Sequence, residues 1–191
     1  RMISVKIDTH GCKLNQADSI QLQKKLTEFG YYVDSSVEKP DVYILNSCTV
    51  THIADKKARQ SLRKYKKENP KSLVVLTGCY AQRDKSNLVK SKIADLIYDN
   101  TEKDEIVKNL SFYLDYQVPQ INHEKIIPGT LIDRTRASVK IQEGCNQICA
   151  YCIVPKVRGR EKSIDKEVIK NEIIYLVESG FKEIILTGTQ L

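Results

Sequence analysis

Six cysteines are the residues of this sequence best suited to chemistry, and they fall into two groups of three. The second group is compact, because Cys145, Cys149 and Cys152 have the spacing C-x-x-x-C-x-x-C. Three thiolates this close can hold one face of an iron-sulfur cube and leave one iron without a protein ligand. That iron can bind an exogenous molecule, whereas a cluster with four cysteine ligands only passes electrons. The spacing indicates a 4Fe-4S cluster, with zinc as the alternative.

The first group is spread along the chain, but its members share one context. Cys12, Cys48 and Cys79 each follow an expected strand and precede an expected helix. The loops after the carboxyl ends of parallel strands converge on one crevice, and helix N-termini favour thiolates. We therefore predict a second cluster site. The alternatives are three small buried hydrophobic side chains, or a zinc site in which His10 is the fourth ligand.

The elements that would position these cysteines alternate between strand and helix. Short apolar runs predict strands at 5–9, 42–45, 73–76 and 95–98, and helical spacing predicts helices at 16–29, 55–69, 82–92 and 103–110. Such alternation implies a parallel sheet covered by helices. We expect the α/β class, with an N-terminal Rossmann-like domain over residues 1–115.

A second unit follows a stretch without clear periodicity. Residues 116–135 contain Pro119, Pro128 and Gly129 and are interpreted as a linker. In residues 136–191 we expect a strand at 137–142, the cysteine motif, a helix capped by Ser163, and a strand at 183–186. One βαβ unit cannot close a barrel, so this second domain is expected to be incomplete.

The formal net charge of +7 is partly concentrated in residues 55–71. Such an excess favours a polyanionic partner, and nucleic acid rather than membrane, because no exposed apolar face accompanies it. A solvated helix face is the alternative. No apolar run is long enough to span a bilayer and no signal peptide is evident, so we expect a cytoplasmic protein whose cysteines bind metal rather than form disulfides. The candidate nucleic-acid contacts are Lys56, Arg59, Arg63, Lys67, Lys156, Arg158 and Arg160.

The segment around the compact motif resembles the methylthiotransferases, a family of radical S-adenosylmethionine (SAM) enzymes. The similarity covers C-x-x-x-C-x-aromatic-C with Tyr151 as the aromatic residue, the preceding residues 139–144, and the following Arg158-Gly159-Arg160. Residues 9–16, THGCKLNQ, look most like the branch that acts on threonylcarbamoyladenosine of tRNA. The resemblance extends over essentially the whole chain, which is about half of a usual member. Lys156 is a departure, because many relatives carry an aromatic or other residue there.

The resemblance implies two 4Fe-4S clusters and SAM as cofactors. One cluster, on Cys145, Cys149 and Cys152, would chelate SAM and cleave it to a radical, and the other would carry the sulfur to be methylated and inserted. The second domain would be the start of a partial TIM barrel. The remaining implied residues are Cys12, Cys48 and Cys79 for the second cluster, Tyr151 near the adenine of SAM, and Thr187, Gly188 and Thr189 near its methionine part.

The implied reaction adds a thiomethyl group to C2 of N6-threonylcarbamoyladenosine in the anticodon loop. Its partners would be tRNA and an electron donor such as flavodoxin or ferredoxin. An unactivated C–H bond requires a radical cofactor, and the protein's share is to position the reactants. The alternatives are a methylthiotransferase that acts on isopentenyladenosine or on a ribosomal protein, an electron-transfer protein, and a non-catalytic iron-sulfur or tRNA-binding fragment.

Overall fold

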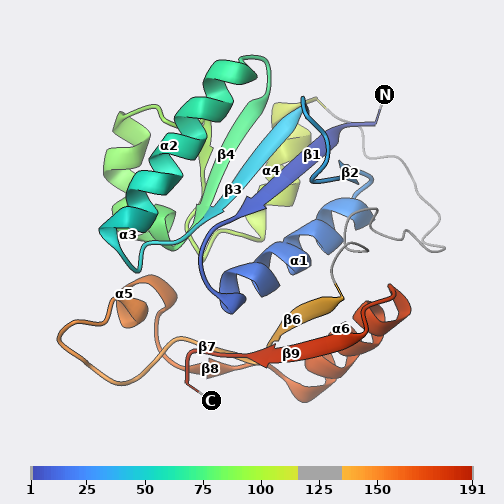
Figure 1. The fold of residues 1–191 in the computed structure, drawn as a ribbon, viewed down its shortest axis with the longest axis vertical. Coiled ribbons are helices and arrows are strands. Elements are labelled where there is room, and N and C mark those ends of the chain that lie inside the picture. Colours follow the sequence, from blue (N-terminus) through green and yellow to red (C-terminus); the bar gives the residue numbers. More distant parts are fainter. Residues whose placement is uncertain (1, 116–134, 191) are drawn as a thin grey trace.

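A five-stranded parallel sheet forms the first unit of the protein, and a smaller parallel sheet forms the second (Figure 1). The computed structural model describes residues 2–115 and 135–190. Nearly all of the predicted linker, 116–135, therefore lies outside the described residues. No described helix is long and apolar enough to cross a membrane.

The first unit confirms the α/β class. All of its strand pairs are parallel, and their order in the sheet is β2-β1-β3-β4-β5. The two-residue edge strand β2 has no counterpart among the predicted strands, since it is too short to show a period. The strands are β1 Ser4–Thr9, β2 Tyr32–Val33, β3 Val42–Ser47, β4 Leu73–Gly78 and β5 Leu96–Ile97; the helices are α1 Lys13–Glu28, α2 His52–Glu68, α3 Cys79–Lys90 and α4 Glu105–Tyr113.

Two hydrophobic cores lie on opposite faces of this sheet. Strand β3 is buried along its whole length, as expected of a strand covered by helices on both sides. Val42 and Ile44 point towards α1 and α4, whereas Tyr43 and Leu45 point towards α2 and α3. The alternation along β3 therefore fixes which helices cover which face.

Helix α3 begins three residues earlier than its predicted start at residue 82. Cys79 is its first residue, and Gly78 precedes it with a φ of 95°. A Cβ at Gly78 would lie 2.3 Å from the carbonyl oxygen of Ser47. Glycine thus allows the chain to turn from β4 into α3 against the neighbouring strand, a turn that apolar periodicity does not reveal.

The second unit is consistent with the start of a barrel. Its elements are β6 Arg136–Lys140, β7 Gln142–Glu143, α5 Val154–Arg158, β8 Lys162–Ser163, α6 Lys166–Glu178 and β9 Glu183–Thr187. Strands β6 and β9 pair in parallel, and β7 and β8 form a small antiparallel sheet. The predicted cap at Ser163 is wrong. Ser163 belongs to β8, where it pairs with Gln142 of β7. Asp165 caps α6 instead, by accepting a hydrogen bond from the Glu167 amide.

Helix α1 lies between the two sheets (Figure 1). Its Leu22 and Leu26 belong to the core of the first unit, whereas Ile20 packs against the core of the second, around Val139. Because α1 starts directly after Cys12, it brings the second unit close to the edge of the first sheet that carries the cysteines.

Candidate functional site

Cys12, Cys48 and Cys79 lie at the carboxyl ends of β1, β3 and β4, which are neighbours in the sheet. From β1 the chain crosses to β2 on one side, and then to β3 on the other. Open α/β sheets bind ligands at the carboxyl ends of the strands where such a reversal occurs. Cys12 is exposed and the other two thiols are buried, so the group opens towards solvent at one corner.

The loops that carry Cys12 and Cys48 touch. Gly11 has a φ of 103°, and a Cβ there would lie 2.5 Å from Cys48 Cβ and 2.8 Å from its Sγ. Burial raises the pKa of the Cys48 thiol, and the neighbouring Cys79 and Cys12 raise it further against the effect of the Val50 and Thr49 backbone amides. The tertiary structure therefore brings the loops of the three cysteines together, as the strand positions predict.

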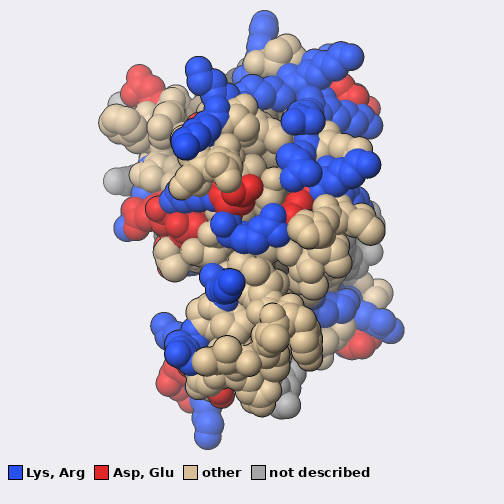
Figure 2. Space-filling model, turned by 90° about the vertical axis from the view of Figure 1, so that its left-hand side faces the viewer, with Lys and Arg blue, Asp and Glu red and all other residues tan. Residues whose placement is uncertain are grey.

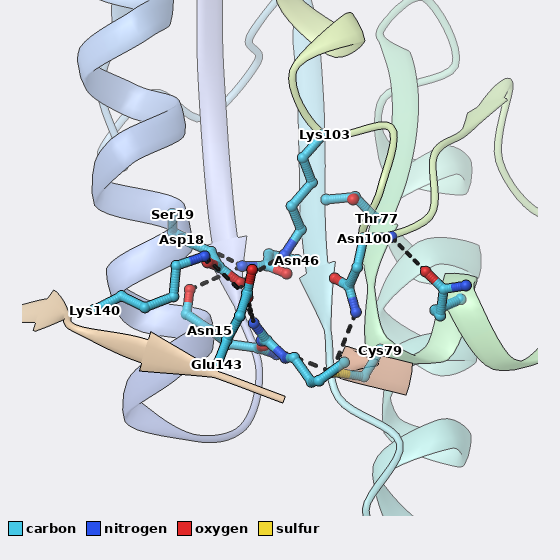
Figure 3. Close-up of polar contacts among 12 residues, drawn as sticks. Asn15, Asp18, Ser19, Asn46, Thr77, Cys79, Asn100, Lys103, Lys140 and Glu143 are labelled. Carbon is cyan, nitrogen blue, oxygen red and sulfur yellow. Dashed lines mark hydrogen bonds and ion pairs between the residues drawn. The ribbon is translucent and has the colours of Figure 1, made fainter. Parts of the chain in front are cut away.

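Asn15 of α1 connects these loops (Figure 3). Its Nδ2 donates to the carbonyl oxygens of His10, at 2.8 Å, and Ser47, at 3.0 Å. Its Oδ1 lies 3.9 Å from the Sγ of Cys79. The Asn46 side chain in turn donates to the backbone oxygen of Asn15, at 2.8 Å. Asn15 is fully buried, and one side chain thereby contacts the cysteine loops after three strands.

The same edge of the sheet contains buried polar atoms without a hydrogen-bond partner among the described residues. They are His10 Nδ1, Asn46 Oδ1, Thr77 Oγ1 and Asn100 Oδ1. Such atoms are uncommon in folded proteins and point to a polar or ionic group at the site. The three thiols fit an iron-sulfur cluster. The amide oxygens of Asn46 and Asn100 would instead face a donor or a cation, because the sulfurs of such a cluster accept hydrogen bonds.

A single metal ion fits less well than a cluster. In the ranges that the structure describes, no group of three or more His, Cys, Asp or Glu side chains is arranged around one ion. The thiolates of a 4Fe-4S cluster bind different irons and need not converge on one point. Zinc with His10 as fourth ligand therefore gains no support from the geometry.

An ion pair between a buried carboxylate and an arginine that reaches the surface holds the Cys48 loop on its other side. Asp55 of α2 accepts a hydrogen bond from Thr49 Oγ1, at 2.6 Å, and pairs with Arg83 of α3, also at 2.6 Å. Thr49 directly follows Cys48, and α3 starts at Cys79. The pair thus ties the Cys48 loop to the helix that begins with Cys79.

The second set of cysteines lies on the loop between β7 and α5. Cys145, Cys149 and Cys152 are all partly exposed. Gly144 has a φ of 75°, and a Cβ there would lie 1.9 Å from the carbonyl oxygen of Arg160, so only glycine fits. The amide of Cys145 donates to the carbonyl oxygen of Gly159 at 3.1 Å. The loop therefore closes on the residues after α5.

Gln142 is a residue of this second site that sequence reasoning missed. Its Oε1 accepts hydrogen bonds from the amides of Thr189 and Gln190, at 2.7 and 3.0 Å, and its Nε2 donates to the carbonyl oxygen of Gly144 at 2.8 Å. Thr189 Oγ1 also donates to that carbonyl, at 2.5 Å. Gln142 thereby joins the cysteine loop to the residues after β9.

The residues predicted to contact SAM lie around this loop and differ in exposure. Thr189 takes part in the contacts of Gln142, Thr187 is buried and Gly188 is partly exposed. Tyr151 is 93% exposed and therefore free to contact a ligand. Their roles towards SAM stay predictions.

Asp18 of α1 joins the two units through three cations (Figure 3). It pairs with Lys103 at 2.7 Å, with Lys140 of β6 at 2.9 Å and with Arg158 of α5 at 2.8 Å. Arg158 Nη2 also donates to Asn15 Oδ1. Asn15 and Asp18 are two of several buried polar residues of α1, with Ser19, Gln23 and Thr27, so nothing in the sequence singled them out.

The charges around Asp18 shift the pKa values of the network. Burial alone would raise the pKa of Asp18, but Lys103, Arg158 and Lys140 hold it well below its ordinary value. The pKa of Lys103 is lowered despite its pairing, because burial outweighs the attraction of Asp18. Burial opposes the charged form of Arg158 as well, yet Asp18 and Cys79 raise its pKa. Asp18 and Arg158 are therefore held in their charged forms, and Cys79 of the first site interacts with the network.

Three of the four candidate nucleic-acid residues on α2, Lys56, Arg63 and Lys67, are exposed. Lys and Arg side chains gather over the upper part of the face that carries α2 and α3 (Figure 2). Arg59 is partly exposed and donates to the Tyr80 hydroxyl at 2.7 Å. The surface can therefore present several cations to a polyanion.

Arg158 corrects one prediction. Its side chain is 3% exposed and its guanidinium is occupied by Asp18, Asn15 and Glu143, so it does not offer a surface contact for nucleic acid. Lys156 and Arg160, its neighbours in sequence, are exposed. Arg158 is therefore part of a buried ion-pair network and not of the basic surface that the sequence predicted.

Comparison with known proteins divides the chain at the same place as the structure. The model of a family described as Uncharacterized protein family UPF0004 matches residues 4–99, and that of the Radical SAM superfamily matches residues 139–190. These ranges contain the two sets of cysteines, one set in each.

Curated relatives match almost the whole chain. Threonylcarbamoyladenosine tRNA methylthiotransferase MtaB of Aquifex aeolicus (strain VF5) is 40% identical over 99% of this chain and 48% of its own length. The protein of the same name in Bacillus subtilis (strain 168) is 35% identical over 98% of this chain and 44% of its own. A tRNA-2-methylthio-N(6)-dimethylallyladenosine synthase of Dictyoglomus thermophilum is 36% identical over 95% of this chain and 44% of its own. The chain spans about half the length of the curated relatives it matches.

Proposed function

Because this chain belongs to the methylthiotransferase family of radical-SAM enzymes, we propose that it forms the cluster-binding part of a tRNA methylthiotransferase. The proposed reaction adds a thiomethyl group to C2 of N6-threonylcarbamoyladenosine in the anticodon loop. Membership of the radical-SAM superfamily implies SAM and one 4Fe-4S cluster. A second cluster, on Cys12, Cys48 and Cys79, is part of the proposal.

The observation that carries this proposal is the pair of three-cysteine sets and their connection. The first set follows β1, β3 and β4, and the second lies on the loop after β7. The Asn100 side chain donates to the carbonyl oxygen of Val157 in α5 at 2.6 Å, and Arg158 donates to Asn15. A sulfur donor and a radical source have to be held within reach of one substrate, which requires such a connection.

The residues of the chain take the following proposed roles. Cys145, Cys149 and Cys152 hold the cluster that binds SAM, and Gln142 fixes their loop to the end of β9 through Thr189. When bound, this cluster supplies reductive cleavage of SAM, which yields the radical needed for an unactivated C–H bond. Tyr151, Thr187 and Gly188 line the place for SAM. The electron comes from a donor such as flavodoxin or ferredoxin.

The tRNA would approach six cations, of which Arg59 is partly exposed and the others are exposed. Lys56, Arg59, Arg63 and Lys67 on α2, with Lys156 and Arg160 beside the second site, can attract phosphates without reading bases. The names of the relatives from Aquifex and Bacillus support threonylcarbamoyladenosine as the modified nucleoside. The relative from Dictyoglomus makes dimethylallyladenosine the competing substrate.

Mass spectrometry of tRNA nucleosides tests the substrate. A strain without this gene should lose thiomethylated threonylcarbamoyladenosine and keep thiomethylated dimethylallyladenosine. The opposite result would assign the competing substrate, and no change in either would refute action on tRNA. Anaerobic reconstitution tests the cofactors, since about eight irons per chain support two clusters and about four support one.

A further inference from the structure

We propose that Asn15 and Arg158 form a polar bridge that positions the thiol of Cys79 and couples the first cysteine site to the radical-SAM unit. In the metal-free chain the Cys79 thiol donates to Asn15 Oδ1, which also accepts from Nη2 of Arg158 in α5. A Cys79 thiolate bound to iron would lose that donor, so Asn15 would then act by holding the cysteine loops and Arg158 in place. The bridge assigns a role to two residues that are not themselves ligands. The proposal rests on the proposed second cluster at Cys12, Cys48 and Cys79.

The contacts of Asn15 leave its side chain little freedom. Both hydrogens of Nδ2 are used by the carbonyl oxygens of His10 and Ser47, so Oδ1 has to face Cys79 and Arg158. These two carbonyls precede the loops of Cys12 and Cys48. Movement of Asn15 would therefore disturb the loops of all three cysteines together.

Arg158 brings a buried positive charge to the first site from the second unit. Its Nη1 is held by Asp18 at 2.8 Å and by Glu143 at 3.4 Å, which leaves Nη2 to bind Asn15. Interaction with Cys79 is among the causes that raise its pKa. A fixed cation beside a thiolate stabilises negative charge there, because screening by solvent is weak in a buried position.

A second contact fixes α5 against Cys79. The Nδ2 of Asn100 lies 3.8 Å from Cys79 Sγ and donates to the carbonyl oxygen of Val157 at 2.6 Å. Cys79 is thus contacted by Asn15 from α1 and by Asn100 from the loop before α4, and Arg158 of the second unit contacts Asn15. Residues that orient metal ligands through hydrogen bonds commonly matter about 10- to 100-fold for metal affinity.

The test uses the chain in which Cys145, Cys149 and Cys152 are changed to alanine, so that iron can bind only at the first site. After anaerobic reconstitution with iron and sulfide, cluster loss to a chelator and the midpoint potential of the cluster are measured. Asn15→Leu should speed the loss about 10- to 100-fold. Thr27→Val is the control, because Thr27 is buried in the same helix and its hydroxyl donates to the carbonyl oxygen of Gln23 in that helix.

The midpoint potential of the cluster distinguishes an effect of the Arg158 charge from a general loss of folding. Arg158→Met should shift the midpoint potential to a more negative value, because a cation near the cluster favours the reduced, more negative state. Arg158→Lys keeps the charge, so its midpoint potential should stay close to that of the chain with Arg158. Its cluster should still be lost faster than with Arg158, because lysine cannot contact Asn15 and Asp18 together as a fork. Arg136→Gln removes an exposed arginine of β6 and should change neither quantity.

Three results would overturn the proposal. The first is a potential that is the same with Arg158→Met as with Arg158, and the second is cluster loss that Asn15→Leu does not speed relative to Thr27→Val. In both of these cases iron still binds, so the proposed function stands. The third is the absence of iron at the first site when Asn15 and Arg158 are intact, which refutes the second cluster and the bridge together.

Discussion

Asp18 and Arg158, which are 140 residues apart in the sequence, form an ion pair of 2.8 Å in which each side chain is only 3% exposed. The pair joins α1 of the first unit to α5 of the second. Lys103 and Lys140 also contact Asp18, so one carboxylate serves three cations. Buried charges of this kind are costly unless each is paired.

Asp18→Asn should therefore destabilise the metal-free chain strongly. The amide removes the charge that Lys103, Lys140 and Arg158 share; Glu143 still faces Lys140 and Arg158, but Lys103 is left without an ion-pair partner among the described residues. An uncompensated buried charge costs about 3 to 5 kcal/mol. Chemical denaturation followed by circular dichroism measures the loss. Glu167→Gln removes an exposed carboxylate of α6 and should cost less than about 0.5 kcal/mol. Equal effects of the two variants would contradict a central role for Asp18.

Stability should fall in acid partly because of Asp18. Its pKa in the folded chain lies below the ordinary value of 3.8, so its contribution is complete above that value and is lost as the pH falls through the folded one. The difference in unfolding free energy between the unsubstituted chain and Asp18→Asn should therefore be constant above about pH 5 and shrink below it. Denaturation at a series of pH values measures this difference. A difference that grows in acid would show that Asp18 is not held as a carboxylate.

The two sets of cysteines should respond differently to SAM. In the reconstituted chain, Cys12→Ala and Cys149→Ala should each reduce iron from about eight to about four per chain. SAM should still perturb the electron paramagnetic resonance spectrum of Cys12→Ala, and it should have no effect on Cys149→Ala. A SAM response in neither variant, or in both, would contradict the assignment of SAM to the second set.

Gly78 and Gly180 offer a matched pair of substitutions. Both have a φ of 95°, but a Cβ at Gly78 would lie 2.3 Å from the Ser47 carbonyl oxygen, whereas a Cβ at Gly180 would have no described residue within 4 Å other than its chain neighbours. Gly180→Ala should cost about 1 to 2 kcal/mol from the backbone conformation alone. Gly78→Ala should cost about 2 kcal/mol more and reduce iron bound at the first site. Equal losses in denaturation would show that the contact between β4 and β3 relaxes freely.

Charge reversal on α2 should weaken the binding of tRNA. Lys56→Glu, Arg63→Glu and Lys67→Glu together should lower the affinity and reduce the slope of its logarithm against that of salt concentration by roughly 2 to 3. The control reverses three exposed lysines of α4 and α6 with Lys108→Glu, Lys166→Glu and Lys170→Glu. Filter binding at several salt concentrations measures both. The same loss of affinity in the control would show that the lysines and arginines of α2 contribute only through the net charge of the chain.

The sequence by itself determined the α/β class, the strand and helix of each repeat, and the place of the first three cysteines between a strand and a helix. Those features depend on local periodicity and on residues such as Cys12 and Gly11 that are neighbours in the chain. It also identified the family, because the compact set from Cys145 to Cys152 is a local motif.

Only the tertiary structure decided which polar residues connect the two sites. Asn15, Asp18 and Gln142 act on partners that are far away in the sequence, and their types are compatible with many surroundings. Arg158 shows the reason most clearly. On charge alone it belongs with the basic residues of the surface, and its burial follows only from the packing of α5 against α3 and from its ion pair with Asp18 of α1.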